Sequence, residues 1–339
     1  MNSIGVLLPC SNIHTASIVR CLKENPENRP VRVYATNNMK SELPDASICD
    51  GVFVVPPVNE GGYIKETIRI CKDNGIGYVM PISSIDLEEL SAHKPRFALE
   101  GIKVSVMDYD RLKAANSKKK LHEVVGEYMP EEIVTSKGSE AVRFAEGRKV
   151  CIKSDGLCGG KGFAVVDNAK SLDIGLFHRY GKKHYISLKQ MEDAIDLSRN
   201  EVIVQEYREG LDYSVCALCD NGKVVCMIGY AGHILEFGSV MYGEVMENKK
   251  AFGITGIVAE RMCLDGNVCL DFIIDHEGNA VLLEVNPRIN ASMGLCAAAG
   301  CNLAWMQLAR LSGESLDGMH IEIRNGMKMK KDYAERYFL

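Results

Sequence analysis

The sequence predicts an α/β protein with three parts: an N-terminal parallel sheet covered by helices, a small α+β segment, and a β-rich remainder. Three observations predict this class. Apolar runs alternate with helical patterns over the first 110 residues, as they do in the βα units of parallel sheets. Residues 130–205 combine short strands with two helices and a glycine-rich turn. From Val202 onward, β-rich runs dominate.

Five strands and three helices are predicted in the N-terminal third. The strands are Ile4–Leu8, Val31–Ala35, Gly51–Val55, Tyr78–Pro81 and Lys103–Val106. The helices are Ala16–Lys23, Tyr63–Asn74 and Leu87–His93. The first strand-to-helix turn lacks the G-x-G-x-x-G spacing of a dinucleotide site, so no nicotinamide cofactor is expected. Ser11 or Asn12 is interpreted as the cap of the first helix, in preference to a substrate contact.

Beyond this third, helical periodicity predicts five further helices. They cover 117–127, Ser139–Glu146, Leu188–Leu197, Thr255–Leu264 and Leu303–Leu311. The basic and aromatic run Leu176–Tyr185 is interpreted as a loop insertion. These patterns divide the chain into an N-terminal domain at 1–112, a second domain at 113–320 and a peripheral tail at 321–339. The second domain consists of a smaller part at about 118–200 and a β-rich part at about 201–320.

Length and composition limit the function classes. The chain has 339 residues, of which 46% are hydrophobic and 25% charged, as in a soluble globular protein of two or three domains. A formal net charge of −5 argues against non-specific nucleic-acid binding. No apolar run reaches the roughly 18 residues of a membrane span. The 13 cysteines are scattered through apolar runs. We therefore expect a cytoplasmic protein with reduced thiols that binds neither nucleic acid nor membrane.

A glycine-rich turn between two predicted strands is the first candidate site. Lys153 ends one strand, the turn contains Gly156, Gly159 and Gly160, and Lys161 precedes the next strand. Glycines let backbone N–H groups approach phosphate oxygens, and lysines supply positive charge. The turn is not a Walker A loop, because no Ser or Thr follows the lysine and a strand comes next. A tight hairpin with surface lysines explains this segment equally well.

A polar hinge joins two β-rich runs at residues 202–215. It contains Gln205, Glu206 and Tyr207, and Asp212 follows them. Such a hinge can present backbone and side-chain groups to a purine edge, and a carboxylate to ribose hydroxyls. For this segment alone, an ordinary β-bend with solvated acids is the favoured interpretation.

A predicted hairpin that turns at Asp275–Gly278 carries the strongest signal. Side chains alternate along a strand, so Glu284 and Asn286 share a face, and the hairpin can bring Asp271 opposite them. Oxygen ligands so arranged suit Mg²⁺ held between protein and nucleotide phosphates. Because a carboxylate on a buried face is costly unless it is paired or metal-bound, metal binding is favoured over a solvated strand end.

In this order and spacing, the clusters resemble the ATP-grasp superfamily over residues 1 to about 318. The most specific element is the run Glu-Val-Asn-Pro-Arg at 284–288, and the variant is closest to the carbamoyl-phosphate-synthetase-like branch. The resemblance implies an ATP-grasp fold with an N-terminal Rossmann-like (pre-ATP-grasp) domain, a small α+β lid and a β-rich nucleotide and metal domain. It also implies ATP and Mg²⁺ as cofactors, with Mn²⁺ as an alternative ion.

The resemblance implies roles for individual residues. Those that would bind the nucleotide are Lys118, Lys153, Gly156, Gly159, Gly160, Gln205, Glu206, Tyr207 and Asp212. Those that would ligate the metal are Asp271, Glu284 and Asn286. Arg288 would steady the acyl phosphate, and Lys161 would offset charge on the γ-phosphoryl group. Two positions depart from the family, because Gln205 replaces a common Glu and Ser154 replaces a common Pro. Neither change removes a group that the reaction needs.

The implied function is that of an ATP-dependent ligase, which activates a carboxylate as an acyl phosphate and passes it to an amine or a thiol. Two alternatives stay open: a bicarbonate-activating enzyme like carbamoyl phosphate synthetase, and a nucleotide-binding sensor without chemistry. The partners would be small carboxylates and amines, and a homodimer is common for this resemblance. His233, Ser292, Met293 and the segment Pro81–Asp86 are candidates to face the substrate, although an ordinary loop histidine is favoured for His233.

Overall fold

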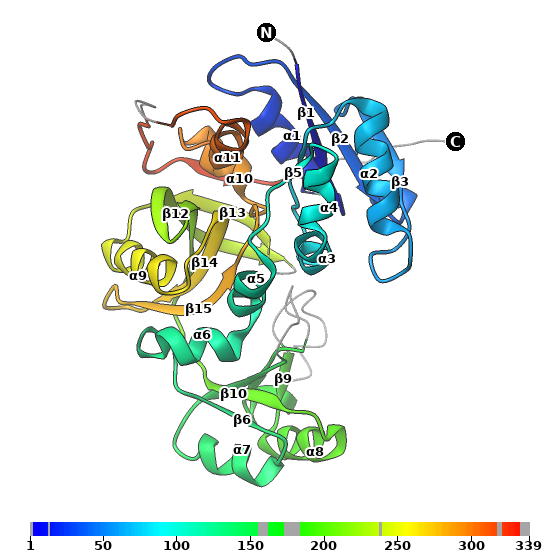
Figure 1. Ribbon diagram of the computed structural model, residues 1–339. Coiled ribbons are helices and arrows are strands. Elements are labelled where there is room, and N and C mark those ends of the chain that lie inside the picture. Colours follow the sequence, from blue (N-terminus) through cyan, green and yellow to red (C-terminus); the bar gives the residue numbers. More distant parts are fainter. Residues whose placement is uncertain are drawn as a thin grey trace.

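The computed structural model describes residues 3–12, 14–154, 162–172, 184–236, 239–316 and 321–332. These residues form three β-sheets with helices packed against them (Figure 1). The sheet of the N-terminal third and the sheet that contains β6 and β10 lie at opposite ends of the molecule, and the third sheet lies between them. In this part of the chain, no helix is both long and apolar enough to cross a membrane.

The N-terminal sheet is parallel and has the strand order β3-β2-β1-β4-β5. Its strands are β1 (Ile4–Leu8), β2 (Val31–Asn37), β3 (Gly51–Val54), β4 (Tyr78–Val79) and β5 (Lys103–Val104). The helices beside it are α1 (Thr15–Lys23), α2 (Tyr63–Asn74), α3 (Leu87–Ala92) and α4 (Lys94–Leu99). Leu7 faces a core shared with α2 to α4, whereas Val6 and Leu8 face α1. The predicted parallel sheet, covered on both faces, is confirmed.

The predicted side-chain cap of the first helix was wrong. The helix α1 begins at Thr15 after His14, and no side chain accepts a bond at its cap position. Asn12 Oδ1 instead accepts from the His14 N–H (2.9 Å), and Ser11 Oγ donates to the Leu8 carbonyl (2.7 Å). Both polar residues therefore hold the turn that precedes the helix.

The second sheet, called the lid sheet here, has the order β6-β10-β7-β8-β9. Its strands are β6 (Glu132–Thr135), β7 (Val150–Lys153), β8 (Ala164–Val166), β9 (His184–Ile186) and β10 (Val202–Glu206). The helices α7 (Gly138–Ala145) and α8 (Leu188–Ser198) contact each other and form a small separate core with the sheet.

The lid has different limits from those predicted. It extends to Glu206, because β10 pairs with both β6 and β7. The helix α6 (Lys118–Val125), expected at the start of the lid, packs elsewhere, because Leu121 and Val125 belong to the core of the third sheet. The lid therefore covers 132–206 rather than about 118–200. Most of the predicted insertion at 176–185 lies outside the described residues.

The third sheet, called the central sheet here, is antiparallel with the order β15-β14-β11-β12-β13-β16. Its strands are β11 (Leu211–Asp220), β12 (Lys223–Glu236), β13 (Ser239–Val245), β14 (Gly266–Ile274), β15 (Ala280–Asn286) and β16 (Lys328–Lys330). Helices α5 (Tyr109–Asn116), α6 and α9 (Lys249–Arg261) share a core with one face of the sheet. Helices α10 (Met293–Ala298) and α11 (Leu303–Ser312) cover the other face and also contact α1. They thereby join the central sheet to the N-terminal one.

The predicted peripheral tail was wrong for the residues that form β16. Lys328–Lys330 pair with Tyr242–Glu244 of β13, so this segment completes the central sheet. Met327 and Met329 pack against the core on the α10 and α11 side, whereas Lys328 and Lys330 are exposed. This alternation is a strand pattern, which the high charge of the segment obscured.

Candidate active site

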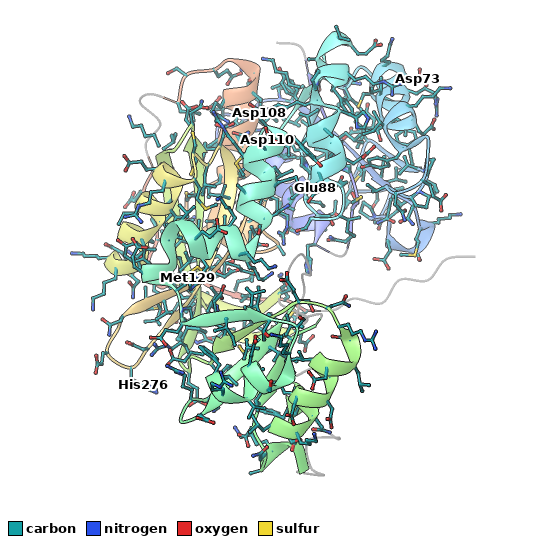
Figure 2. All side chains as sticks on the ribbon, turned by 60° about the horizontal axis from the view of Figure 1, so that its bottom comes forward. Asp73, Glu88, Asp108, Asp110, Met129 and His276 are labelled. Atoms are coloured by element: carbon teal, nitrogen blue, oxygen red, sulfur yellow. The ribbon has the colours of Figure 1, made fainter. Side chains whose placement is uncertain are left out.

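The predicted metal-binding side chains meet on one face of the β14–β15 hairpin. Asp271 lies opposite Glu284, and Asn286 lies two residues further along the same face. Asn286 Nδ2 donates to Asp271 Oδ2 (2.9 Å) and to Glu284 Oε1 (3.3 Å). The turn of the hairpin, which contains His276, lies at the far end of these strands (Figure 2). The predicted placement of the three side chains is confirmed, and their binding of a metal stays a prediction.

The carboxyl group of Asp271 has a perturbed acidity. Its pKa is raised to about 7, because the group is buried and lies beside the Glu284 carboxylate. Ser214 Oγ donates to Asp271 Oδ1 (2.6 Å), which favours the ionised form and opposes the shift. A cation between the two carboxylates would offset both the cost of burial and the repulsion between them.

The donor set fits Mg²⁺. The described residues hold no group of three or more His, Cys, Asp or Glu side chains suited to a metal ion, so the protein offers two carboxylates and an amide here. Mg²⁺ is usually bound by one or two carboxylates, with water and substrate phosphates as its other ligands. Asn286 now turns its Nδ2 toward the carboxylates, and a half-turn of the carboxamide would offer Oδ1 to the ion instead.

Lys118 reaches this carboxylate pair from α6. Its Nζ lies 3.7 Å from Glu284 Oε2, and its side chain is only 14% exposed. The next two lysines point elsewhere, because Lys119 pairs with Glu201 (2.5 Å) and Lys120 with Glu123 (2.8 Å). Of the three lysines in this run, Lys118 is therefore the one beside the carboxylates, and its contact with a nucleotide phosphate stays a prediction.

Arg288 connects the central sheet to the N-terminal domain. Its Nε donates to Ser84 Oγ (2.9 Å), from the loop that follows β4. Its Nη1 donates to the Ile289 carbonyl (3.1 Å), and Nη2 lies 3.5 Å from Asn286 Oδ1. The guanidinium thus sits beside Asn286 and at the carboxyl end of the parallel strands, where open α/β sheets bind ligands. Segment Pro81–Asp86, a predicted substrate-facing loop, contributes Ser84 to this contact.

Lys153 and Gln205 are already in contact in the lid sheet. Lys153 Nζ donates to Gln205 Oε1 (2.6 Å), and Gln205 Nε2 donates to Glu132 Oε2 (2.7 Å). Gln205 is 2% exposed, so its carboxamide is fixed by these two partners. A carbonyl oxygen has two lone pairs, so Gln205 Oε1 can accept one further bond. Lys153 ends β7, and the glycine-rich turn follows it in the sequence.

The backbone N–H groups of the hinge are used within the protein. The Glu206 N–H donates to the Glu131 carbonyl (2.8 Å), and the Tyr207 N–H donates to the Lys149 carbonyl (2.7 Å). The prediction that these two residues offer their backbone to the adenine ring is thereby narrowed to their carbonyl oxygens. The Glu206 side chain is also engaged, by Nη2 of Arg208 (2.8 Å).

Asp212 lies on the same face of the central sheet as Asp271 and Glu284. It precedes Ser214 by two residues on β11, and Ser214 pairs with Asp271 of β14. Its carboxylate is therefore about 7 Å further along the strand than Ser214, toward the lid. A ribose contact by Asp212 stays a prediction. The predicted phosphate-binding residues Gly156, Gly159, Gly160 and Lys161 lie outside the described residues.

The remaining residues predicted to face the substrate are His233, Ser292 and Met293, and their surroundings differ. His233 Nε2 lies 3.9 Å from Glu244 Oε2, and its ring contacts Tyr242. Ser292 and Met293 begin α10 and are almost fully buried, so they belong to the protein core. Among the described residues, none of these three side chains forms a hydrogen bond or ion pair with the carboxylate pair.

Three residues that hold predicted site residues in position were not predicted from the sequence. Ser214 fixes Asp271, Glu132 fixes Gln205, and Ser84 fixes Arg288. Ser214 is a polar residue within an otherwise apolar strand run, and this was a signal in the sequence that could have identified it. In the structure, Ser214 pairs with Asp271 on the neighbouring strand. Ser84 is separated from Arg288 by 204 positions, and no local pattern joins them.

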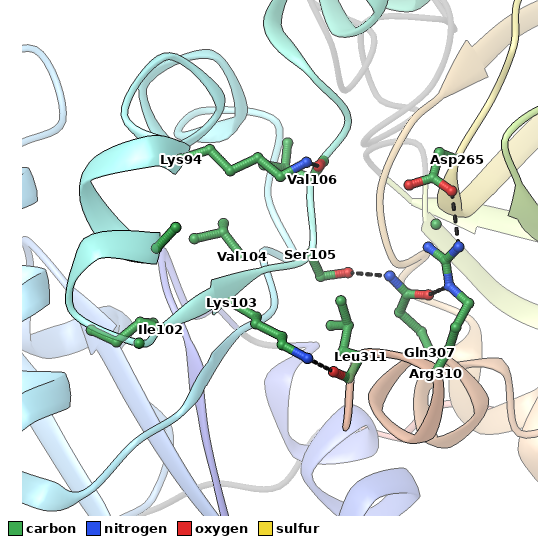
Figure 3. A pocket seen from close by; sticks show the side chains of 13 residues that line it. Lys94, Ile102, Lys103, Val104, Ser105, Val106, Asp265, Gln307, Arg310 and Leu311 are labelled. Carbon is green, nitrogen blue, oxygen red and sulfur yellow. Dashed lines mark hydrogen bonds and ion pairs between the residues drawn. The ribbon is translucent and has the colours of Figure 1, made fainter. Parts of the chain in front are cut away.

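A cavity of about 400 Å³ lies elsewhere, between the N-terminal domain and α11 (Figure 3). Its polar groups are bonded to one another: Lys103 Nζ donates to the Leu311 carbonyl (2.6 Å) and Gln307 Nε2 to Ser105 Oγ (2.8 Å). Arg310 is held by Asp265 (3.0 Å). The lining contains none of the predicted site residues, so the candidate site is the hairpin and its surroundings, not this cavity.

Two family models match the sequence. The model described as ATP-grasp in the biosynthetic pathway with Ter operon matches residues 198–333. The model described as the PylC-like N-terminal domain matches residues 7–105. The first match contains the hinge, the hairpin and β16, and the second contains most of the parallel sheet. No curated protein sequence matches the chain.

Solved structures share the fold at low sequence identity. The biotin carboxylase domain of 2-oxoglutarate carboxylase from Hydrogenobacter thermophilus has a TM-score of 0.67 at 17% identity, over 96% of this chain and 73% of that one. For N5-carboxyaminoimidazole ribonucleotide synthetase the TM-score is 0.67 at 13% identity, over 95% and 79% of the two chains. For L-amino acid ligase from Bacillus licheniformis it is 0.62 at 12% identity, over 94% and 77%. With the parallel N-terminal domain, the lid sheet and the carboxylate-bearing hairpin in this arrangement, the chain has the ATP-grasp fold, and its residues 198–333 match an ATP-grasp family model.

Proposed function

We propose that the protein is an ATP- and Mg²⁺-dependent ligase that activates a carboxylate as an acyl phosphate and joins it to an amine or a thiol. One observation carries this proposal. Asp271, Glu284 and Asn286 converge on one face of the hairpin, with Arg288 beside them and Lys118 facing Glu284. A sensor that had lost its chemistry would have no need for two carboxylates kept at such proximity in a partly buried site.

The proposed roles of the individual residues are as follows. Lys118 and Lys153 bind phosphate oxygens of ATP, and Asp212 holds the ribose. Mg²⁺, when bound at Asp271, Glu284 and Asn286, supplies neutralising charge for the phosphates. Arg288 binds the substrate carboxylate through two parallel N–H donors, a geometry that a lysine does not offer. The turn with Gly156, Gly159, Gly160 and Lys161 would cover the β- and γ-phosphates.

The reaction proceeds in two balanced steps. An oxygen of the carboxylate attacks the γ-phosphorus of ATP, and ADP leaves. The amine then attacks the acyl carbon, phosphate leaves, and the amine loses a proton to solvent. Positioning and charge neutralisation provide most of the rate, as in phosphoryl transfer generally. The lid excludes water, which would otherwise hydrolyse the acyl phosphate.

The similar structures support this proposal. One was solved with MgADP, ADP and bicarbonate, another with ADP, and a third is an amino acid ligase. The bicarbonate in the first favours a second candidate, an enzyme that activates bicarbonate. Dependence of ADP release on bicarbonate, with no need for an organic acid, would identify that reaction.

The test measures ADP release from the protein with Mg-ATP and pools of amino acids, small acids, amines and bicarbonate. We expect turnover that needs one acid and one amine, and that Glu284→Ala lowers at least 100-fold. Glu277→Ala, in the exposed turn of the same hairpin, is the matched control and is expected to stay within twofold of the wild type. Unchanged turnover in Glu284→Ala, or tight ATP binding without ADP release in any pool, would contradict the proposal.

A further inference from the structure

Three basic side chains from distant parts of the sequence gather beside the candidate site. His14 precedes α1, Arg288 follows β15, and Lys331 follows β16. We call these three residues the basic cluster. Burial, together with the charges of Lys331 and Arg288, lowers the pKa of the His14 imidazole to about 4. His14 is therefore neutral at pH 7, and it lies close enough to both cations to feel their charge.

The basic cluster lacks a counter-ion among the described residues. Lys331 Nζ donates to Ser239 Oγ (3.0 Å) and to the Ala291 carbonyl (3.3 Å), and Arg288 donates to a serine, a carbonyl and an amide. In the described ranges, no carboxylate lies within 4.0 Å of a side-chain nitrogen of any of the three residues. Asp271 acts on Arg288 electrostatically, but Asn286 lies between them.

A partly buried ammonium group without a counter-ion is costly. Burial lowers the pKa of Lys331 to about 8, which reports this cost. The neighbouring lysines avoid it, because Lys330 pairs with Asp332 (3.2 Å) and Lys328 with Glu244 (3.5 Å) at the surface. Among the described lysines of this segment, Lys331 is thus the one without a carboxylate partner, and it bonds instead to Ser239 and to the Ala291 carbonyl.

The backbone holds the basic cluster in place. The Lys331 N–H donates to the Met241 carbonyl (2.8 Å), which continues the pairing of β16 with β13. Ser17 Oγ donates to the His14 carbonyl (2.9 Å), at the close contact of α1 with α10. The Ala291 carbonyl that binds Lys331 is three residues after Arg288, and three residues span at most about 11 Å. The carbonyl that holds the Lys331 ammonium group is therefore close to the backbone of Arg288, and the charges of both residues act on His14.

We propose that the acid substrate of this ligase carries a second anionic group, a carboxylate or a phosphate, which Lys331 and His14 bind while Arg288 holds the reacting carboxylate. This inference rests on the proposed function and adds the class of substrate to it. A substrate dianion would supply the counter-ion that the described residues do not provide. The ammonium of Lys331 and an imidazole N–H of His14 would donate to its second group.

The test compares acids that differ only in the second group: glutamate with glutamine, aspartate with asparagine, and phosphoserine with serine. Each is assayed by ADP release with the wild type, Lys331→Met, Lys331→Arg and Lys330→Met. We expect Lys331→Met to raise KM at least 10-fold for the anionic member that the wild type prefers, with little change for its neutral partner. Lys331→Arg should recover part of the loss, and Lys330→Met, at the exposed neighbour, should behave as the wild type.

Direct binding separates this inference from the proposed function. The same acids are added to the protein with Mg-ADP, and the melting temperature is measured. Stabilisation by an anionic acid that is lost in Lys331→Met supports the basic cluster even if no ligation is found. The response of Lys331→Met to Mg-ADP alone verifies that it is folded. Preference of the wild type for the neutral acids, or an equal loss for both members of a pair, would overturn the inference.

Discussion

Asp86 is a fully buried carboxylate at the carboxyl edge of the N-terminal sheet. Its Oδ2 accepts from the Tyr63 hydroxyl (3.0 Å), whereas its Oδ1 is buried without a hydrogen-bond partner among the described residues. Burial raises its pKa to about 6. A group whose folded pKa exceeds its unfolded value stabilises the fold below about pH 4, and this contribution is lost as the pH rises through 6.

Replacing Asp86 with Asn should therefore stabilise the protein at neutral pH. Asparagine cannot ionise, so the gain should be small at pH 4.5 and about 1–3 kcal/mol at pH 7.5. Urea unfolding at the two pH values measures the difference. Glu88→Gln, at an exposed carboxylate of the next helical turn, is the control and should change stability little at either pH. A loss of stability at pH 7.5 would mean that Asp86 is held ionised by a partner of opposite charge.

At the residue scale, the sequence predicted groups that one strand or hairpin brings together. Asp271, Glu284 and Asn286 were found because alternation and a short turn fix their relative positions. The pairs Ser84–Arg288 and Lys331–Ser239 were out of reach, because they join segments 204 and 92 positions apart. Such contacts depend on the packing of separate elements, which a single sequence does not reveal.

At the scale of elements, the passage from the lid sheet to the central sheet depends on Gly210. It lies between β10 and β11, and a Cβ there would be 2.2 Å from the Ile274 carbonyl oxygen and 2.6 Å from Ile273 Cγ2. Backbone atoms cannot yield as a flexible side chain can. The start of β11 would have to move away from β14, which carries Asp271.

Gly210→Ala should lower the melting temperature by several degrees, corresponding to about 2 kcal/mol or more. Gly253→Ala is the matched control, because Gly253 lies within α9 and a Cβ added there would meet no described atom within 4 Å outside its own helical turn. There, alanine should stabilise the helix by about 0.5–1 kcal/mol. Differential scanning calorimetry measures the melting temperatures of both variants. If Gly210→Ala changes the melting temperature no more than Gly253→Ala does, the close contact at Gly210 relaxes without loss of stability.

The helices and strands that were predicted well are those with a regular apolar pattern and a clear signal at one end. The strands of the N-terminal sheet and α2 have such patterns, and α2 ends at Gly75 with a positive φ of 63°. The helix α9 was predicted over Thr255–Leu264 but covers Lys249–Arg261, since the signal at its cap, Asn248, was overlooked. The helix α5 was missed, because its short polar sequence has little apolar periodicity.

At the scale of the whole molecule, the nucleotide would lie between two bodies. Lys153 and Gln205 belong to the lid sheet, whereas Glu284 and Asp271 belong to the central sheet. A ligand that contacts both bodies stabilises the assembled molecule in proportion to its binding free energy. A ligand at a concentration of 100 times its Kd adds about 2.7 kcal/mol to the free energy of unfolding.

Mg-ADP should accordingly raise the melting temperature of the wild type by more than ADP with a chelator does. Asp271→Asn should remove the difference between the two conditions, because it takes away one of the two carboxylates at the proposed metal site. Glu277→Gln, in the turn of the same hairpin, should keep it. If Asp271→Asn responds to Mg-ADP as the wild type does, the ion is not held at this hairpin.

The order of the motifs in the sequence predicted the fold of the whole chain. It did not predict where the lid and the central sheet begin and end. The lid extends to β10, and β16 returns to the central sheet from the C-terminal segment. Strand order in a sheet is decided by pairing between distant segments, which local periodicity does not encode.

The pairing of β16 with β13 also bears on solubility. Over Tyr242–Glu244, the outer backbone groups of β13 are matched by Lys328–Lys330. A chain shortened before residue 328 would leave that row of N–H and C=O groups bare. A bare strand edge is a template for pairing with another chain. Trimming the C-terminal segment would therefore favour aggregation as well as removing Lys331, and a purification tag is better attached at the other terminus.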